Sequence, residues 1–241
     1  MLSRKSGESG TAVTFKRTIE YSPIEIVTQH RHLGVVISED LKWYHHVQKV
    51  IGKFSRRSGL LRWMAQGLPF EAASKLYHFY VRPVCEYASP VWHGSLRADQ
   101  ALYLERIQAG VARRLLSASR LTSKSSLLQL LGWPSLRWRR EIASMTLFHS
   151  LVHTRPSPLS DNLFPFSSTV CPHRNHRKPY QLVIDHARTN SLLNSFFYRS
   201  SLLWNTLPHS LQGKKRQLHF QQGRETYWLK YKFLTDSNIP L

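Results

Sequence analysis

The chain has 241 residues, 41% of them hydrophobic, which is enough to bury a core in one large or two small domains. Lysine and arginine number 34 against 14 aspartate and glutamate, so the formal net charge is +20 and polyanions are the expected partners. No apolar run reaches about 18 residues, so a membrane protein is not expected. The first residues lack the apolar segment of a secretory signal and the chain has only 2 cysteines, so we expect an intracellular protein, cytoplasmic or nuclear, that is not secreted.

Residues 1–41 predict a small antiparallel β element. Apolar residues recur with a period of two at positions 13, 15, 19 and 21 and again at 24 and 26, which predicts the two strands of a hairpin. A third short strand is predicted over residues 33–37, where Gly34 marks a bulge or the close approach of another backbone.

Residues 42–153 predict a helical domain that begins with a basic amphipathic helix. The apolar face of this helix carries Trp43, Val47, Val50, Ile51, Phe54 and Leu61. The rest of its surface is crowded with lysine and arginine, and no aspartate or glutamate lies between Lys42 and Leu68. Because these cations have no acidic neighbours along the helix, we favour a phosphate-binding face over a merely solvated one.

Two aromatic-rich apolar stretches flank Pro83 in the middle of this domain. Pro83 lacks a backbone donor and is expected to interrupt or kink the helix, while Tyr87, Val91 and Trp92 continue the apolar face beyond it. We expect residues 76–93 to form the middle of one buried core, with Tyr87 and Trp92 inside it. A packed helix pair is favoured over an active site, because no polar residue here is accompanied by the further polar residues that a catalytic site needs.

Three more helices follow in the helical domain. The apolar pattern predicts one over residues 98–115. Thr122 or Ser123 is expected to cap a short helix that Gly132 closes, and residues 133–135 are expected to begin another.

The composition then changes. Four prolines and several serines indicate a linker over residues 154–172, and residues 173–241 form a basic C-terminal segment. Within that segment we predict a strand over residues 180–184 and a helix over residues 192–207 that Pro208 stops.

For the tail over residues 214–233, helix and strand periods fit about equally and both stay open. The predicted fold class is therefore mainly α: a helical bundle preceded by a small antiparallel β element, with a second, smaller α+β segment at the C-terminus.

No constellation in the sequence predicts catalysis. Polymerases and nucleases that use two metal ions need two or three carboxylates converging on Mg²⁺. The sole adjacent acidic pair, Glu39 and Asp40, falls at a predicted turn and helix start, where acidic side chains are favoured for structural reasons. The sequence has no phosphate loop, nucleophile elbow or zinc-protease helix, so we predict neither a catalytic residue nor a cofactor.

One cluster has residue types that bind zinc. Cys171, His173 and His176 form a CxHxxH pattern, with His186 further along. Because the chain has 13 histidines, we favour a chance cluster beside the linker and predict no metal site.

The candidate functional residues are basic side chains on the predicted polar faces and in the C-terminal segment, where they are expected to contact phosphate. They are Lys49, Lys53, Arg56, Arg57, Arg113, Arg114, Arg137, Arg139, Arg140, Arg174, Arg177 and Lys178.

A series of segments, in chain order from about residue 24 to about residue 212, resembles a known family. The segments are HRHLGVVISEDLKWYHHV, LYHFYVRPVCEYASPVWHG, LERIQAGVARRLL, LLQLLGWPSLRWRREIASMTLFHSLVH, ARTN and SFFYRSSLLWNTLP. Together they resemble the C-terminal part of reverse transcriptases from LINE-type non-LTR retrotransposons, of the jockey and chicken-repeat kinds.

The resemblance implies a division of labour along the chain. Residues 1–41 would match the end of the palm, with His32, Leu33 and Gly34 in its primer grip, and residues 42–153 would match a thumb-like domain. The remainder would handle template RNA and target DNA. The family's Tyr-x-Asp-Asp catalytic loop lies upstream in the palm and has no counterpart here, so the resemblance implies a fragment of an RNA-directed DNA polymerase that is inactive alone.

Two alternatives stay open beside this interpretation. The first is a nucleic-acid-binding protein adapted to serve a host, and the second is an interaction module that uses its aromatic face to join a separate palm-containing polymerase chain. The expected partners are RNA, DNA or both, and a membrane is not among them.

Overall fold

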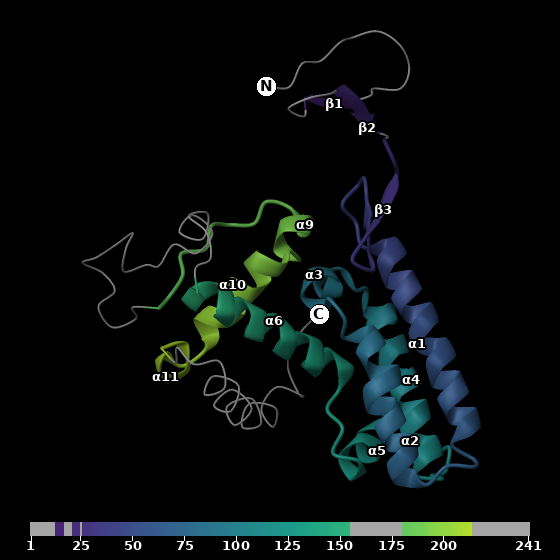
Figure 1. Ribbon diagram of the computed structural model, residues 1–241. Coiled ribbons are helices and arrows are strands. Elements are labelled where there is room, and N and C mark those ends of the chain that lie inside the picture. Colours follow the sequence, from purple (N-terminus) through teal and green to yellow (C-terminus); the bar gives the residue numbers. More distant parts are fainter. Residues whose placement is uncertain (1–12, 17–20, 25, 155–179, 214–241) are drawn as a thin grey trace. The chain divides into compact units, whose positions relative to one another are not determined.

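The computed structural model describes residues 13–16, 21–24, 26–154 and 180–213 (Figure 1). These residues are mostly helical, and a small antiparallel β element precedes a helical bundle, which confirms the predicted fold class. The chain divides into two compact units, residues 1–46 and residues 47–241.

The strands of the described residues form two hairpins. β1 (Val13–Lys16) pairs antiparallel with β2 (Tyr21–Ile24), and β3 (Gln29–His32) pairs antiparallel with β4 (Val35–Ser38) in a separate sheet. The first pairing confirms that a hairpin forms here, but its second strand begins at Tyr21, before Pro23, and ends at Ile24, so the predicted strand bounds are wrong. β4 overlaps the predicted third strand, but its partner β3 was missed because the sequence QHRH shows no apolar alternation.

The turn between β3 and β4 corrects the role predicted for Gly34. Leu33 and Gly34 have φ angles of 47° and 85°, so both lie in the left-handed region. A two-residue turn of this kind matches the twist of a hairpin, so Gly34 serves a tight turn and not a bulge. The candidate primer-grip residues His32, Leu33 and Gly34 thus lie at the end of β3 and in this turn.

α1 (Tyr44–Met64) is the predicted basic amphipathic helix. Its core-facing residues Val47, Val50, Phe54 and Leu61 are buried. Its contacts with the rest of the bundle include the Arg57 guanidinium, which reaches the backbone oxygen of Tyr80.

The central stretch forms a series of short helical pieces. α2 (Phe70–Leu76) leads into a π turn (Tyr77–Val81), a 3₁₀ turn (Arg82–Cys85) and α3 (Ser89–Trp92). The helix is thus interrupted at Pro83, as the missing backbone donor predicts.

The predicted core of this stretch is confirmed at Trp92, which is fully buried and whose indole N–H donates to the backbone oxygen of Tyr87 at 3.0 Å. It is wrong for the side chains of Tyr87 and Val91, which are 56% and 44% exposed. Ala88 has a φ of 49°, and this left-handed residue changes the direction of the chain, so a helical period cannot be extended across it.

The remaining helices of the predicted helical domain lie where they were predicted. They are α4 (Ala98–Leu115), α5 (Lys124–Leu130) and α6 (Leu136–Thr154). The Ser123 hydroxyl accepts from the backbone N–H of Ser126 and so caps α5, and Gly132 follows the helix with a φ of 62°. Within the described ranges, no helix is both long and apolar enough to cross a membrane.

The C-terminal segment is helical but is divided more finely than predicted. The single predicted helix is two, α9 (Asn190–Leu193) and α10 (Phe196–Thr206), because α9 ends at its C-cap Asn194 and the hydroxyl of Ser195 caps the start of α10. α11 (His209–Gln212) follows Pro208.

The predicted strand over residues 180–184 is reduced to a single bridge position at Leu182. The side-chain amide of Asn205 accepts from the Leu182 N–H and donates to the Leu182 carbonyl, both at 2.9 Å. This side chain therefore supplies the hydrogen bonds that a neighbouring strand would give.

One core joins α6 to the segment that follows the predicted linker. Its buried members are Met145, Phe148, Val152, Leu182, Trp204 and Leu207. Residues before and after the linker therefore pack together. The linker itself from residue 155, and the tail from residue 214, lie outside the described residues.

Candidate nucleic-acid interface

The basic face of α1 is the best-formed candidate surface. Lys49, Lys53 and Arg56 are all exposed. Their spacing of four and then three residues places them one above another on one side of the helix, opposite the buried apolar face. In the part of the chain that the structure describes, no carboxylate pairs with any of them. We call these three residues the α1 stripe.

Two large apolar side chains continue the α1 stripe toward the end of the helix. Leu60 and Trp63 follow Arg56 at four and seven residues, which keeps them on the same side. The Trp63 side chain is 71% exposed. An indole that lies in line with three cations offers a flat face on which a nucleic-acid base can stack.

Arg57 was predicted to belong to this surface, but its guanidinium is engaged within the protein. One nitrogen donates to the backbone oxygen of Tyr80 at 2.7 Å, and the group lies 4.1 Å from the centre of the Tyr80 ring. Arg57 therefore anchors α1 to the central stretch, and a phosphate would have to compete with these contacts.

Arg113 and Arg114 on α4 were both predicted to contact phosphate, but their surroundings differ. Arg113 is half-buried and donates to the backbone oxygen of Thr122 at 3.2 Å, so it holds the loop before α5. Arg114 is exposed, and no acidic partner is found for it among the described residues.

Arg62 and Arg106, which were not among the candidates, extend the positive surface beside Arg114. The Arg62 guanidinium lies 3.4 Å from the position that a Cβ atom on Gly110 would occupy, so α1 and α4 are close here. Arg106 and Arg114 lie one turn before and one turn after Gly110, and both are exposed. The sequence shows that Gly110 leaves space on α4 for a side chain from another element. Only the fold shows that Arg62 is the residue that occupies this space.

Arg137 and Arg139 are paired with carboxylates. Arg137 contacts Glu141 at 3.1 Å, one turn along α6. Arg139 forms two hydrogen bonds with Glu86, which also contacts Arg82 at 3.2 Å. The bonds to Glu86 raise the pKa of Arg139. These charges serve the fold, so they are weak candidates for phosphate contacts.

The prediction that Arg140 contacts phosphate is wrong, because its side chain is fully buried. Its Nε donates to Nδ1 of His93 at 3.3 Å, and the guanidinium lies 6.0 Å from the ring centre of Trp92. Burial lowers the pKa of Arg140, since the charged form loses its hydration. A periodic pattern could not distinguish this arginine from its exposed neighbours.

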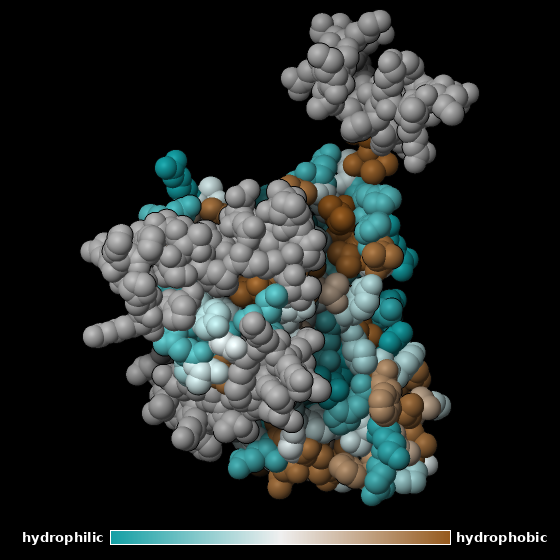
Figure 2. Space-filling model, turned by 60° about the vertical axis from the view of Figure 1, so that its left-hand side comes forward, coloured by the Kyte–Doolittle hydropathy of each residue, from teal (hydrophilic) through white to brown (hydrophobic). Residues whose placement is uncertain are grey.

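Other hydrophobic side chains of the described surface gather in patches (Figure 2). The most exposed of them are Leu33, Leu41, Phe79, Leu121 and Leu130. Figure 2 shows such a patch at the end of the bundle where α2 and α5 lie. Such a patch offers no charge to an anionic partner, whereas the α1 stripe offers three cations.

Several predicted residues cannot be placed. Arg174, Arg177 and Lys178, and the CxHxxH cluster of Cys171, His173 and His176, lie outside the described residues. Among the residues that are described, no group of three or more histidine, cysteine, aspartate or glutamate side chains is arranged to hold a metal ion.

Comparison with known proteins adds no match. No family model, no curated protein and no solved structure matches this chain.

Proposed function

We propose that this chain is the thumb-like and C-terminal part of a non-LTR retrotransposon reverse transcriptase, and that it binds RNA or single-stranded DNA through the α1 stripe. The observation that carries the proposal is the placement of Lys49, Lys53 and Arg56, exposed on one side of α1 with no carboxylate partner among the described residues. The proposed location is intracellular, in the cytoplasm or nucleus.

The distribution of acidic residues supports this use of the α1 stripe. Carboxylates pair with cations elsewhere in the chain: Asp40 with Lys42, Asp99 with Arg97, and Glu86 with Arg139. Like charges one turn apart on a helix repel each other, and a phosphate backbone relieves that repulsion while it releases condensed counterions. The arrangement thus suits a polyanion.

The family resemblance supports the proposal because its segments contain residues that hold the fold together. In VRPVCEYASPVW, Glu86 joins Arg82 to Arg139 and Trp92 is fully buried. In WNTLP, Trp204 is fully buried and Asn205 pairs with the backbone of Leu182. If the segments that resemble the family contain the residues that stabilise this fold, the family and this chain are expected to have the same fold in this region.

The proposal includes no catalysis by this chain alone. Glu39 and Asp40 are an isolated acidic pair, and the family's Asp-Asp loop has no counterpart in the sequence. Primer extension on a primed RNA template with Mg²⁺ is therefore expected to stay at the level of a mock preparation. Extension that Asp40→Asn abolishes would contradict this part of the proposal.

The second candidate is an interaction module for a separate palm-containing chain. The specific observation in its favour is the exposure of aromatic residues on the central stretch, with Phe79 82% exposed and Tyr87 56% exposed. A host-adapted nucleic-acid-binding protein would use the same α1 stripe, so it differs from the first proposal in biological setting and not in chemistry.

Matched charge removal tests the proposed binding surface. One variant changes Lys49, Lys53 and Arg56 to glutamine, and the control changes Lys75, Arg120 and Lys124, which are exposed elsewhere, so both lose the same charge. If each stripe residue makes one phosphate contact, the stripe variant loses about 100-fold in affinity for a short unstructured RNA at about 0.1 M salt. The control is expected to lose much less. Equal losses would leave only generic attraction to polyanions.

A further inference from the structure

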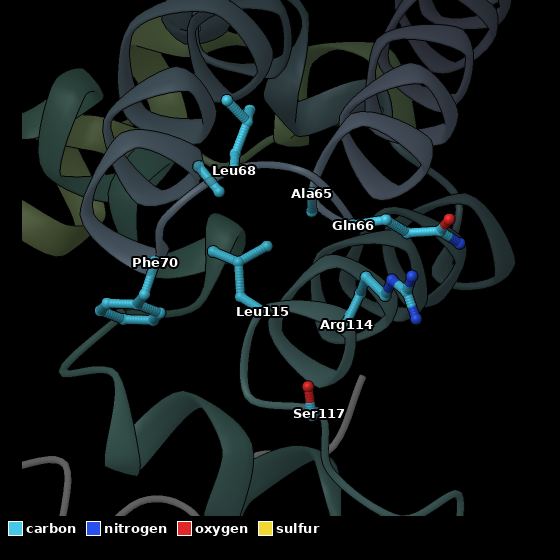
Figure 3. Close-up of a pocket in the computed structure, with 8 residues that line it drawn as sticks. Ala65, Gln66, Leu68, Phe70, Arg114, Leu115 and Ser117 are labelled. Atoms are coloured by element: carbon cyan, nitrogen blue, oxygen red, sulfur yellow. The ribbon is translucent and has the colours of Figure 1, made fainter.

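A cavity of about 290 Å³ opens where the end of α1, the start of α2 and the end of α4 meet (Figure 3). One wall of the cavity is the segment that joins α1 to α2. This segment follows Trp63, so the cavity lies beyond the end of the α1 stripe. A volume of this size is at the lower end of the range for small-molecule pockets, about 300 Å³, and so gives room for one small ligand.

The lining of the cavity has two chemically different sides. Figure 3 shows Leu68, Phe70 and Leu115 toward one side of the opening and Gln66 and Arg114 toward the other. The Phe70 side chain is 44% exposed, so part of its ring is accessible. Because most of the surface that the cavity exposes is polar, a fitting ligand needs polar or charged groups beside a flat part that can lie against the apolar side chains.

The polar side is positively charged. Arg114 is exposed, and among the described residues it has no carboxylate partner; none of the cavity's lining residues is acidic. Arg62 lies against Gly110, one turn before Arg114 on α4, and adds a second guanidinium to this surface. Guanidinium groups bind phosphate oxygens in a planar, two-pronged arrangement, so the charged group of the ligand is best a phosphate.

We propose that this cavity binds one nucleotide, with its base against Phe70 and Leu115 and its phosphate at Arg114. A nucleotide has the flat apolar body and the adjacent anion that the two sides require, and its base stacks on an aromatic ring whatever its sequence. In the setting of the proposed function, this nucleotide is an unpaired one beyond the strand that lies on the α1 stripe. The inference rests on the proposed function for that setting, but the cavity itself is tested with a free nucleotide.

Calorimetric titration of the full chain with adenosine monophosphate is the direct test. Arg114→Gln removes the phosphate contact, and Phe70→Leu keeps an apolar side chain while it removes the flat ring. Each change is expected to weaken binding about 10-fold. Arg120→Gln is the matched control, since Arg120 is an exposed arginine that does not line the cavity, and it is expected to change the affinity less than about 2-fold.

Three results would overturn the proposal: no binding of adenosine monophosphate, an equal effect of Arg120→Gln and Arg114→Gln, or equal competition by inorganic phosphate. The last would mean that the base is not held. The α1-stripe variant separates this proposal from the proposed function. If that variant loses RNA affinity while adenosine monophosphate fails to bind, only the nucleotide site is wrong; if the nucleotide binds but the stripe variant behaves like its control, only the proposed function is wrong.

Discussion

His93 is a largely buried histidine that is held in its neutral form by burial and by the positive charges around it. Nδ1 accepts a hydrogen bond from Arg140, so the ring proton is on Nε2, which lies 4.0 Å from a Glu141 carboxylate oxygen. Burial, with the positive charges of Arg140, Arg199 and Arg137 as smaller causes, lowers the pKa of His93 to about 2. The histidine is therefore an acceptor that helps to satisfy a buried arginine.

This gives a prediction for stability against pH. The pKa of His93 is about 2 in the folded chain and about 6.5 when unfolded, so between these values the unfolded state binds more protons. The contribution of neutral His93 to the free energy of unfolding is thus fully present above pH about 6.5. As the pH decreases below this value, the free energy of unfolding falls by up to about 1.4 kcal/mol per pH unit from this group.

Urea unfolding between pH 7 and pH 5 measures the effect. His93→Asn is expected to flatten the pH dependence, whatever it does to stability at pH 7, while His45→Asn, at an exposed position, is expected to leave it as in the unchanged chain. If His93→Asn keeps the original slope, His93 is not the buried neutral group described above.

At the scale of elements, the end of α4 carries a residue in an unfavourable conformation. Ser117 has a φ of 48°, and its N–H bonds the carbonyl of Arg114 while the next N–H, of Ala118, bonds that of Arg113. This is a Schellman ending, in which the left-handed position normally holds glycine. The serine Cβ makes that conformation costly.

Ser117→Gly is therefore expected to raise the free energy of unfolding by about 0.5 to 1 kcal/mol. Ala101→Gly, inside α4, is the opposite control and is expected to lower it by about 1 kcal/mol. Thermal unfolding distinguishes the two signs. A loss of stability in both variants would mean that Ser117 is not in the left-handed conformation.

The elements that sequence predicts well are those fixed by local signals. α1 follows from its apolar period, and α5 follows from the Ser123 cap and Gly132. The predictions fail where conformation or pairing is set from a distance: Tyr87 is exposed because Ala88 adopts a left-handed conformation, and β3 is a strand because β4 pairs with it.

The same division applies to the candidate interface. The α1 stripe was found because one helical period places its three residues on one side, and the period is written in the sequence. The sequence could not show that Arg139 is paired with a carboxylate, since its partner Glu86 lies 53 residues away in the chain. The approach of Arg62 to Gly110 is likewise a tertiary contact.

At the scale of the molecule, the core of the central stretch depends on Trp92, which is fully buried. Trp92→Ala is expected to lower the free energy of unfolding by about 3 to 5 kcal/mol, because it leaves a cavity and removes a large apolar side chain. Phe79→Ala is the control, since this side chain is 82% exposed, and its effect is expected within about 0.5 kcal/mol. Equal melting temperatures for the two variants would show that Trp92 is not in the core.

The charge of the molecule is divided between structure and surface. Of its net charge of +20, part lies on arginines that the fold uses, such as Arg139 beside Glu86 and Arg140 in the core. The α1 stripe has no such use among the described residues, and Arg57 beside it is bound to Tyr80. The central claim is that these three cations, and not the net charge in general, bind a single-stranded nucleic acid.

The salt dependence of binding tests that claim most directly. Each phosphate contact contributes about −0.7 to the slope of log K against log salt concentration for a single strand, so changing Lys49, Lys53 and Arg56 to glutamine is expected to flatten the slope by about 2. The control change of Lys75, Arg120 and Lys124 removes the same charge at other exposed positions and is expected to leave the slope close to that of the unchanged chain. If both variants flatten the slope equally, the α1 stripe is not a binding site and the chain attracts polyanions over its whole basic surface.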